Sequence, residues 1–263
     1  MAIEVNAVPF SYVAHVLAIA GAVMVLVWCI HFRGGLAWES SNKSLIFNAE
    51  IAIGSLTLCR PHRVDNGPRG GIHYAMHPVL MLIGLIIIGG EAIMSYKSLP
   101  LKKEVKKLIH LVLHAIALIL GIIGVYAAFK YHNESSIANL YSLHSWLGIG
   151  IISLYGIQLI KARKVDLWIH CVLLPGGTDA IRRESVPWHA LFGLFVYVLA
   201  VGNAALGFLE KLTFLENSGV AKYGSEAFVV IFSAVITILF GAFVMLTVLS
   251  RAPPEDDYSY STI

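Results

Sequence analysis

Six predominantly apolar runs, each long enough to cross a lipid bilayer, restrict this chain to one kind of fold. Each has about 18 or more residues, and they lie near residues 10–32, 78–96, 108–129, 143–160, 189–209 and 226–249. Inside hydrocarbon the backbone must satisfy its own hydrogen bonds, so runs of this length form helices. The sequence therefore predicts an all-α membrane protein with six transmembrane helices in a single domain over residues 1–263, with both termini on one side.

The composition agrees with membrane insertion and excludes an ordinary soluble domain. Charged residues make up 13% of the chain and the mean hydropathy is +0.75, whereas soluble domains carry about 25% charged residues. The first apolar run lacks a basic leader and a small-residue cleavage site, which indicates a retained helix rather than a signal peptide.

Basic residues in the short loops indicate the orientation, because loops rich in lysine and arginine stay cytoplasmic. One side collects most of them and is predicted to be cytoplasmic, together with both termini. The net charge of +3 reflects this loop bias and gives no argument for nucleic-acid binding. The residues of the cytoplasmic set are Lys97, Lys102, Lys103, Lys106, Lys107, Lys161, Arg163, Lys164, Arg182, Arg183 and Arg251.

Four histidines lie near the starts of four successive apolar runs: His77, His110, His144 and His189. Because consecutive spans run in opposite directions, the starts of the second and fourth spans share one face of the membrane, and the starts of the third and fifth share the other. His77 should therefore meet His144 near the outer or luminal face, and His110 should meet His189 near the cytoplasmic face. Two imidazole pairs in a central four-helix bundle indicate two six-coordinate haems and electron transfer across the membrane.

Glycines recur on the histidine faces, where a flat porphyrin would have to approach a helix closely. Glycine also allows tight helix packing in membranes, so each position alone has two interpretations. His114 shares a helix face with His110, but its depth relative to His189 favours His110 as the ligand. The glycines at spacings that return to the ligand's face are Gly84 after His77, Gly121 after His110, Gly148 after His144 and Gly193 after His189.

The cysteines limit how any haem is held. Cys29, Cys59 and Cys171 show no paired spacing and no C-x-x-C-H attachment site, so the predicted cofactor is b-type haem, two per chain. The chain also lacks a Walker sequence, H-E-x-x-H and a dinucleotide-binding glycine motif. Electrons must then come from a small donor or a partner.

Several short runs resemble the cytochrome b561 family, most closely its plant members. They are His31-Phe32-Arg33-Gly34-Gly35, His77-Pro78-Val79, Tyr141-Ser142-Leu143-His144-Ser145-Trp146 and Pro187-Trp188-His189, in the family's order over residues 8–250. The resemblance implies six helices, two b haems in the central four, and electron transfer from cytoplasmic ascorbate to monodehydroascorbate or a ferric chelate across the membrane. It also implies the vacuolar membrane (tonoplast) as the location; a homodimer is left open.

The family's substrate positions carry over to matching stretches at each end. On the cytoplasmic side the resemblance implies that Lys103, Lys106 and Lys107 bind ascorbate, an anion at neutral pH that a cationic cluster attracts; Arg182 and Arg183 could complete this pocket. On the other side it implies an acceptor pocket at Tyr131, His132 and Tyr141. Positive-inside bias and an aromatic belt would produce the same residues without any substrate role.

Two segments depart from the family pattern. A turn-rich insertion over residues 49–76 precedes His77, and a charged stretch over residues 161–171 predicts that the fourth helix ends near Ile160 or Lys161. Glu91 in the second span is expected to pair with Lys97 or a lysine of the next loop. The tail from about 251 to 263 has the composition of a disordered segment.

Two other hypotheses stay open at this point. One is a haem-free proton or metal transporter whose histidines line a polar path. The other is a splice variant with impaired haem binding, because the two unusual segments could come from altered splicing or a faulty gene prediction. Haem content would separate both from an electron carrier.

Overall fold

The computed structural model describes residues 3–33, 76–171 and 178–251, with backbone only over 3–4, 161–171 and 178–184. Within this part of the chain, six helical segments are long and apolar enough to cross a membrane. They are Ala7–Phe32, Met76–Ser98, Lys103–Glu134, Leu143–Ile160, Ser185–Asn217 and Ser225–Leu249. The prediction of an all-α protein with six transmembrane helices is confirmed, whereas most of the insertion at 49–76 and nearly all of the tail lie outside the described residues.

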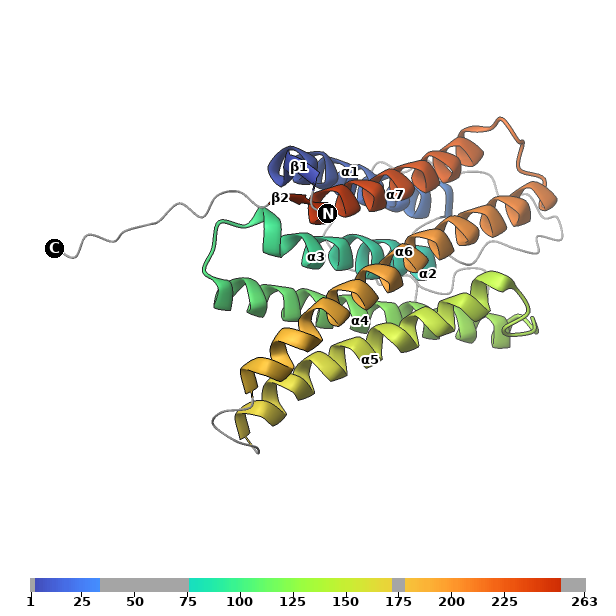
Figure 1. Cartoon of the computed structure of the whole chain (residues 1–263). Coiled ribbons are helices and arrows are strands. Elements are labelled where there is room, and N and C mark those ends of the chain that lie inside the picture. The colour runs from blue at the N-terminus through green and yellow to red at the C-terminus, as the bar shows by residue number, and fades with distance from the viewer. Residues whose placement is uncertain (1–2, 34–75, 172–177, 252–263) are drawn as a thin grey trace, which may run out of the picture.

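The first and last spans form a closely packed pair on one side of the molecule (Figure 1). Helix α1 (Ala7–Val27) continues into a short π-helix, η1 (Trp28–Phe32), and packs against α7 (Ser225–Leu249). Small buried residues at Ser11, Ala14, Ala18 and Gly21 recur every three or four positions on α1 and let the two backbones approach. Strand β1 (Ile3–Asn6) pairs in parallel with β2 (Ser250–Arg251), so the described chain begins and ends at the same end of the bundle.

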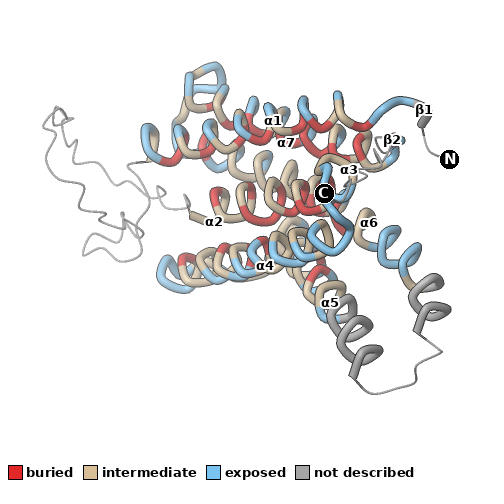
Figure 2. The backbone as a smooth tube through the Cα atoms, turned by 90° about the vertical axis from the view of Figure 1, so that its left-hand side faces the viewer, coloured by how far each residue is buried: buried red, intermediate tan, exposed pale blue. Residues whose placement is uncertain are grey.

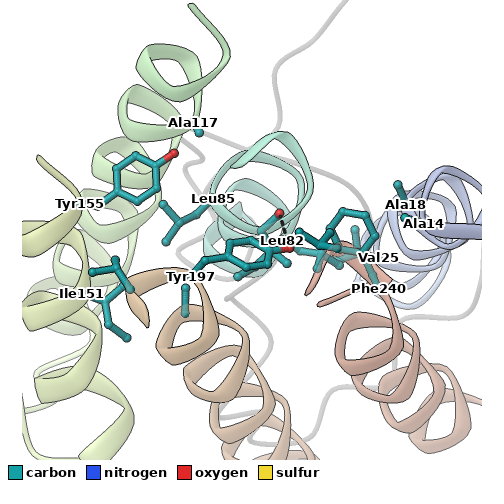
Figure 3. Packing of buried hydrophobic residues seen from close by; sticks show 14 of the residues in the cluster. Ala14, Ala18, Val25, Leu82, Leu85, Ala117, Ile151, Tyr155, Tyr197 and Phe240 are labelled. Atoms are coloured by element: carbon teal, nitrogen blue, oxygen red, sulfur yellow. Dashed lines mark hydrogen bonds between the residues drawn. The ribbon is translucent and has the colours of Figure 1, made fainter. Parts of the chain in front are cut away.

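The second span is the centre of the molecule. It consists of α2 (Met76–Val79), a π-helical stretch η3 (Leu80–Ile88) and α3 (Gly89–Ser98). Of its apolar window 56% is buried, against 11–33% for the other five spans. Helices α1, α4, α6 and α7 all contact it, and the buried side chains of Leu82 and Leu85 lie in the core between them (Figure 3).

Helices α4 (Lys103–Glu134), α5 (Leu143–Cys171) and α6 (Thr178–Asn217) complete the bundle around the second span. The prediction that the fourth helix ends near Ile160 is wrong, because α5 continues to Cys171. Its apolar span does end at Ile160. Alanine, leucine, lysine and arginine are good helix formers, so a helix can continue beyond the bilayer without a continuous apolar run.

Outward faces and the interior differ in the way that a lipid environment requires. Large apolar side chains such as Tyr12, Ile19 and Phe195 are exposed. Figure 2 shows buried and exposed positions alternating along the helices. The core buries Phe240, Ile86 and Met94 almost completely. Because hydrocarbon solvates apolar side chains as well as a protein core does, such exposed surfaces are stable only in the membrane.

Candidate haem-binding site

The structure brings His77 and His144 together at one end of the bundle. His77 is the second residue of α2 and His144 the second of α5, and their ring centroids lie 6.0 Å apart with the planes at 85°. His77 Nδ1 donates to the carbonyl oxygen of Gly124 on α4 at 2.9 Å. His144 Nδ1 donates to the carbonyl oxygen of Asn203 on α6, also at 2.9 Å.

A second pair, His110 and His189, has the same arrangement. The two centroids are 6.3 Å apart with the ring planes at 77°. His110 Nδ1 donates to the carbonyl oxygen of Ala92 on α3 at 2.8 Å. His189 Nδ1 donates to the side-chain oxygen of Gln158 on α5 at 2.9 Å. The pairings expected from alternating helix direction are therefore present in the structure; metal ligation by these histidines is a proposal.

The geometry of both pairs fits a metal held between two imidazoles. A metal–imidazole bond is about 2.0–2.1 Å long, so an ion held between two imidazoles would leave their ring centres roughly 6 Å apart. Their spacings are 6.0 and 6.3 Å. Carbonyl oxygens only accept hydrogen bonds, so the proton is on Nδ1 and Nε2 keeps its lone pair for the metal. Among the described residues no group of three or more His, Cys, Asp or Glu could hold a metal ion. The donor set therefore suits haem rather than an all-protein metal site.

These four hydrogen bonds form a reciprocal pattern. The second span and α4 each supply the acceptor for the other's histidine, and so do α5 and α6. The second span and α4 form one helical hairpin, and α5 and α6 form another. Each imidazole pair, in contrast, joins a histidine of the first hairpin to one of the second. The two hairpins are thus the units that orient the ligands, and a metal would bridge them.

A cavity of about 180 Å³ opens beside His77 and His144. Its wall is mostly apolar, with Met81, Leu82 and Phe208 among the lining side chains. Polar residues from three helices also line it, including Ser145 on α5, Asn203 on α6 and Ser233 on α7. An apolar wall with a few placed polar groups is the usual character of a cofactor site.

Only some of the predicted glycines are free of helix packing. A Cβ on Gly193 would meet nothing within 4 Å, and one on Gly148 would meet only Asn203 Nδ2, at 3.3 Å. A Cβ on Gly84 would lie 2.5 Å from Leu120 Cβ, and one on Gly121 would lie 2.7 Å from Ile152 Cδ1. The expectation that these last two clear a porphyrin face is wrong, because they allow close packing between helices. For Gly84 the cause is the π-helix after His77, which turns the chain less per residue than an α-helix.

Gly207 is the close-approach glycine that sequence reasoning missed. A Cβ there would lie 2.7 Å from His144 Cε1 and 3.2 Å from both ring nitrogens. The signal was available, since Gly207 follows His189 by 18 residues, which is about five helical turns and returns to the same face of α6.

His114 lies beside the pair of His110 and His189 without completing a pair of its own. Its ring centroid is 4.3 Å from that of His110, and its Nδ1 is hydrogen-bonded to the hydroxyl of Tyr155 on α5. The contact between His110 and His189 agrees with the depth argument that set His114 aside.

The lysines expected to bind ascorbate lie near His110. Lys103 begins α4 and is exposed, whereas Lys106 and Lys107 are partly buried. Lys106 Nζ donates to the carbonyl oxygen of Tyr96 at 3.5 Å, and the ring of Tyr96 lies 5.1 Å from that of His110. The backbone of Arg182 and Arg183 is in the first turns of α6, and their side chains lie outside the described part of the chain.

Tyr131, His132 and Tyr141 cluster at the opposite end of the bundle. The ring of His132 lies 6.1 Å from that of Tyr131 and 6.0 Å from that of Tyr141. His132 and Tyr141 line the cavity beside His77. Burial raises the pKa of the Tyr141 phenol, with smaller contributions from Glu210 and Tyr131, so the phenol stays protonated.

A buried ionic cluster at the same end was not predicted. Glu226, near the start of α7, accepts hydrogen bonds from Arg33 and from the indole nitrogen of Trp28. Arg33 and Lys211 lie 5.8 and 5.4 Å from the Trp28 ring centroid, respectively. Glu210 and Lys211 also line the cavity, so two charged side chains lie in the otherwise mostly apolar wall beside His77 and His144.

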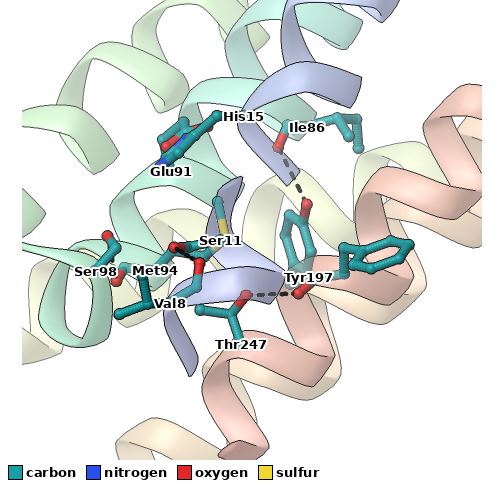
Figure 4. Close-up of polar contacts among 10 residues, drawn as sticks. Val8, Ser11, His15, Ile86, Glu91, Met94, Ser98, Tyr197 and Thr247 are labelled. Atoms are coloured by element: carbon teal, nitrogen blue, oxygen red, sulfur yellow. Dashed lines mark hydrogen bonds and ion pairs between the residues drawn. The ribbon is translucent and has the colours of Figure 1, made fainter. Parts of the chain in front are cut away.

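Glu91 has a different partner from the one expected. His15 Nδ1 on α1 lies 2.9 Å from Glu91 Oε1 (Figure 4), whereas Lys97 Nζ donates to the carbonyl oxygen of Ser250 at 2.7 Å. The expected pair fails because Glu91 faces α1, which packs against α3, and Lys97 faces the end of α7.

Six membrane-spanning helices that hold two facing histidine pairs define a multi-pass membrane protein with the architecture of a transmembrane redox carrier. Residues 76–215 match the family model of eukaryotic cytochrome b561. The chain belongs to this family, which implies haem b, and it is a transmembrane oxidoreductase.

The sequence matches its plant relatives over nearly their whole length. The chain is 56% identical to transmembrane ascorbate ferrireductase 1 of Arabidopsis thaliana, with all of both proteins aligned. It is 54% identical to the probable ascorbate-specific transmembrane electron transporter 1 of Oryza sativa subsp. japonica, over 100% of this chain and 99% of the relative. It is 30% identical to the transmembrane ascorbate-dependent reductase CYB561 of Sus scrofa, over 90% of this chain and 78% of the relative.

Proposed function

We propose that this protein carries electrons from ascorbate on the His110 side to monodehydroascorbate or a ferric chelate on the His77 side, through two b haems. His77 and His144 would hold one haem, called the outer haem, and His110 and His189 the other, called the inner haem. The observation that carries the proposal is that each pair faces across the bundle with both Nδ1 atoms hydrogen-bonded to neighbouring helices. The plant relatives' names, ascorbate ferrireductase and ascorbate-specific electron transporter, support ascorbate as the donor.

The protein's part in this chemistry is to fix the ligands. When bound, haem b supplies reversible one-electron chemistry at iron. The hydrogen bonds at Nδ1 hold each ring in one orientation, set its tautomer and increase the basicity of Nε2. Two imidazoles held by separate helices change little in position when the charge on the metal changes. The mostly apolar cavity wall lowers the local dielectric constant beside His77 and His144.

Ascorbate would bind beside Lys103, Lys106 and Lys107, with Arg182 and Arg183 completing the pocket. Ascorbate is an anion at neutral pH, so a cationic cluster raises its local concentration and guides it to the His110 pair. Lys106 supports this location, because its Nζ donates a hydrogen bond to the carbonyl oxygen of Tyr96, and the ring of Tyr96 lies beside that of His110.

The electron acceptor would bind beside Tyr131, His132 and Tyr141. His132 and Tyr141 line the cavity that reaches His77 and His144, so an acceptor there would be in contact with the outer pocket. The protonated phenol of Tyr141 can donate a hydrogen bond to an oxygen-rich acceptor.

The ascorbate end and both termini would lie in the cytoplasm, which the positive-inside bias supports, and the resemblance to plant members favours the vacuolar membrane. The pairing of β1 with β2 keeps the described ends of the chain together on one side, as this topology requires. Assembly as a homodimer in the lipid bilayer is part of the same proposal.

The test is the reduced-minus-oxidised absorption spectrum of the purified full chain, with haem quantified per chain and ascorbate as reductant. Two low-spin b haems that ascorbate reduces would support the proposal. His144→Leu should remove one haem and His189→Leu the other, whereas His15→Gln, which alters a histidine outside both pairs, should keep two. A colourless protein would contradict the proposal and favour a histidine-lined transporter or a defective variant.

A further inference from the structure

Asn203 is a buried carboxamide without a complete set of hydrogen bonds. It lies in the middle of α6 and is 7% exposed. Its Oδ1 is buried and, among the described residues, has no hydrogen-bond partner. Burying an unpaired polar atom is unfavourable, and an apolar side chain of similar size would avoid the penalty. The side chain therefore needs an explanation other than packing.

The position of Asn203 connects it to the outer histidine pair. Its backbone carbonyl accepts the hydrogen bond from His144 Nδ1, and its side chain lines the cavity beside His77 and His144. Asn203 Nδ2 would lie 3.3 Å from a Cβ on Gly148, which is one turn after His144 on α5. The carboxamide is thus part of the wall that faces the metal site.

Two other buried polar side chains in the bundle form hydrogen bonds with the backbone of their own helix. Ser233 Oγ and Thr237 Oγ1 each donate at 2.7 Å to the carbonyl oxygen four residues earlier on α7. Asn203 Oδ1 cannot do this, because an oxygen of a carboxamide only accepts. A porphyrin offers no donor at its edge, so the groups that can interact with Oδ1 are an ordered water and the positive charge of oxidised iron.

We propose that Asn203 tunes the outer haem electrostatically, lowering its reduction potential relative to an apolar residue at this position. The inference rests on the proposed function, since it requires a haem between His77 and His144. With two neutral imidazoles, the iron–porphyrin core carries one positive charge when ferric and none when ferrous. A carboxamide oxygen, and a water bound to it, stabilise the charged form in a site of low dielectric constant. The outer haem consequently gives up its electron to an acceptor more readily.

The experiment is a redox titration of the full chain carrying Asn203→Leu, followed by absorption and electron paramagnetic resonance. We expect the midpoint of the outer haem to rise and that of the inner haem to stay unchanged. Each tenfold change in the equilibrium constant for electron transfer between the haems corresponds to a 59 mV shift in the midpoint for a one-electron couple. The spectrum of His110→Leu, in which only the outer haem is expected, assigns the two transitions.

Thr237→Val is the matched control, because it removes a buried hydroxyl that lies on α7 outside the cavity wall. It should leave both midpoints in place. An unchanged or lower outer midpoint in Asn203→Leu would overturn the inference while leaving two haems, and hence the proposed function, intact. Wild-type protein with fewer than two haems would instead contradict the proposed function.

A second variant covers the case in which Asn203→Leu binds less haem. Asn203→Met, whose flexible side chain fits irregular spaces, should give the same upward shift. If neither variant retains two haems while Thr237→Val does, Asn203 is required for haem binding itself, and the tuning role is refuted.

Discussion

Gly207→Ala tests the outer histidine site with a single methyl group. The new Cβ would lie 2.7 Å from His144 Cε1, whereas ordinary van der Waals contact begins at 3.4 Å. The imidazole would therefore have to move by about 0.7 Å. Moved away from α6, it would stretch its 2.9 Å hydrogen bond to the Asn203 carbonyl beyond the usual limit.

The expected loss of haem affinity follows from the steric overlap with His144 and from its weakened hydrogen bond to Asn203. Overpacking a rigid ring costs about 1–3 kcal/mol, and one neutral hydrogen bond contributes about 1 kcal/mol. Together they give about 2–4 kcal/mol, which corresponds to roughly 30- to 1000-fold weaker retention of the outer haem. The inner haem should be unaffected, because His110 and His189 lie at the other end of the bundle.

The assay is haem content per chain, together with the rate at which haem transfers to an excess of a soluble haem-binding protein. Gly202→Ala is the matched control on the same helix, since a Cβ there would meet nothing within 4 Å. Equal retention of both haems in Gly207→Ala and Gly202→Ala would refute the argument that His144 is a ligand held against α6.

Three further changes probe the other parts of the site. Gln158→Leu removes the acceptor of His189 Nδ1 and should weaken inner-haem retention by about 10- to 100-fold, measured as haem content; unchanged retention would show that this hydrogen bond is dispensable. Replacing Lys103 and Lys107 with Gln should slow reduction by ascorbate and reduce its salt dependence, with dithionite reduction as the control; an unchanged ascorbate rate would exclude a cationic docking site. Because burial raises the pKa of Tyr141, its phenol should stay protonated as the pH rises to about 10 and ionise only above that. Acceptor reduction should therefore show no step below about pH 10, and a step there that Tyr141→Phe removes would contradict this.

The histidine pairs could be predicted from the sequence because they depend only on the alternating direction of consecutive spans and on the depth of each histidine in the membrane. Consecutive spans alternate direction, and a residue near the start of an apolar run lies near one face of the membrane. Neither statement requires knowledge of which helices touch. The same reasoning distinguished His110 from His114, which are only one turn apart on α4.

Contacts that depend on tertiary packing could not be predicted in this way. The pairing of Arg33 with Glu226 joins residues 193 positions apart, and that of His15 with Glu91 joins residues 76 apart. Both require that α1 packs against α7 and α3, which hydropathy does not reveal. The prediction that Gly84 shares the face of His77 failed for a local reason. The π-helix between them rotates Gly84 away from that face, and no sequence pattern predicts a π-helix here.

The reciprocal hydrogen bonds give the proposed haem sites a structural consequence. Within each helical hairpin, one helix orients the histidine of the other, whereas both imidazole pairs cross from the first hairpin to the second. Helices α4 and α5, one from each hairpin, make few direct contacts with each other. One of these contacts depends on Gly121, because the missing side chain leaves room for Ile152 of α5 against α4. A ligand that binds the assembled bundle and not the separated hairpins stabilises the assembly in proportion to its affinity. Haem bound at both pairs would therefore hold the two hairpins together at each end of the bundle, so that the groups which transfer electrons would also fix the arrangement of the helices that position them.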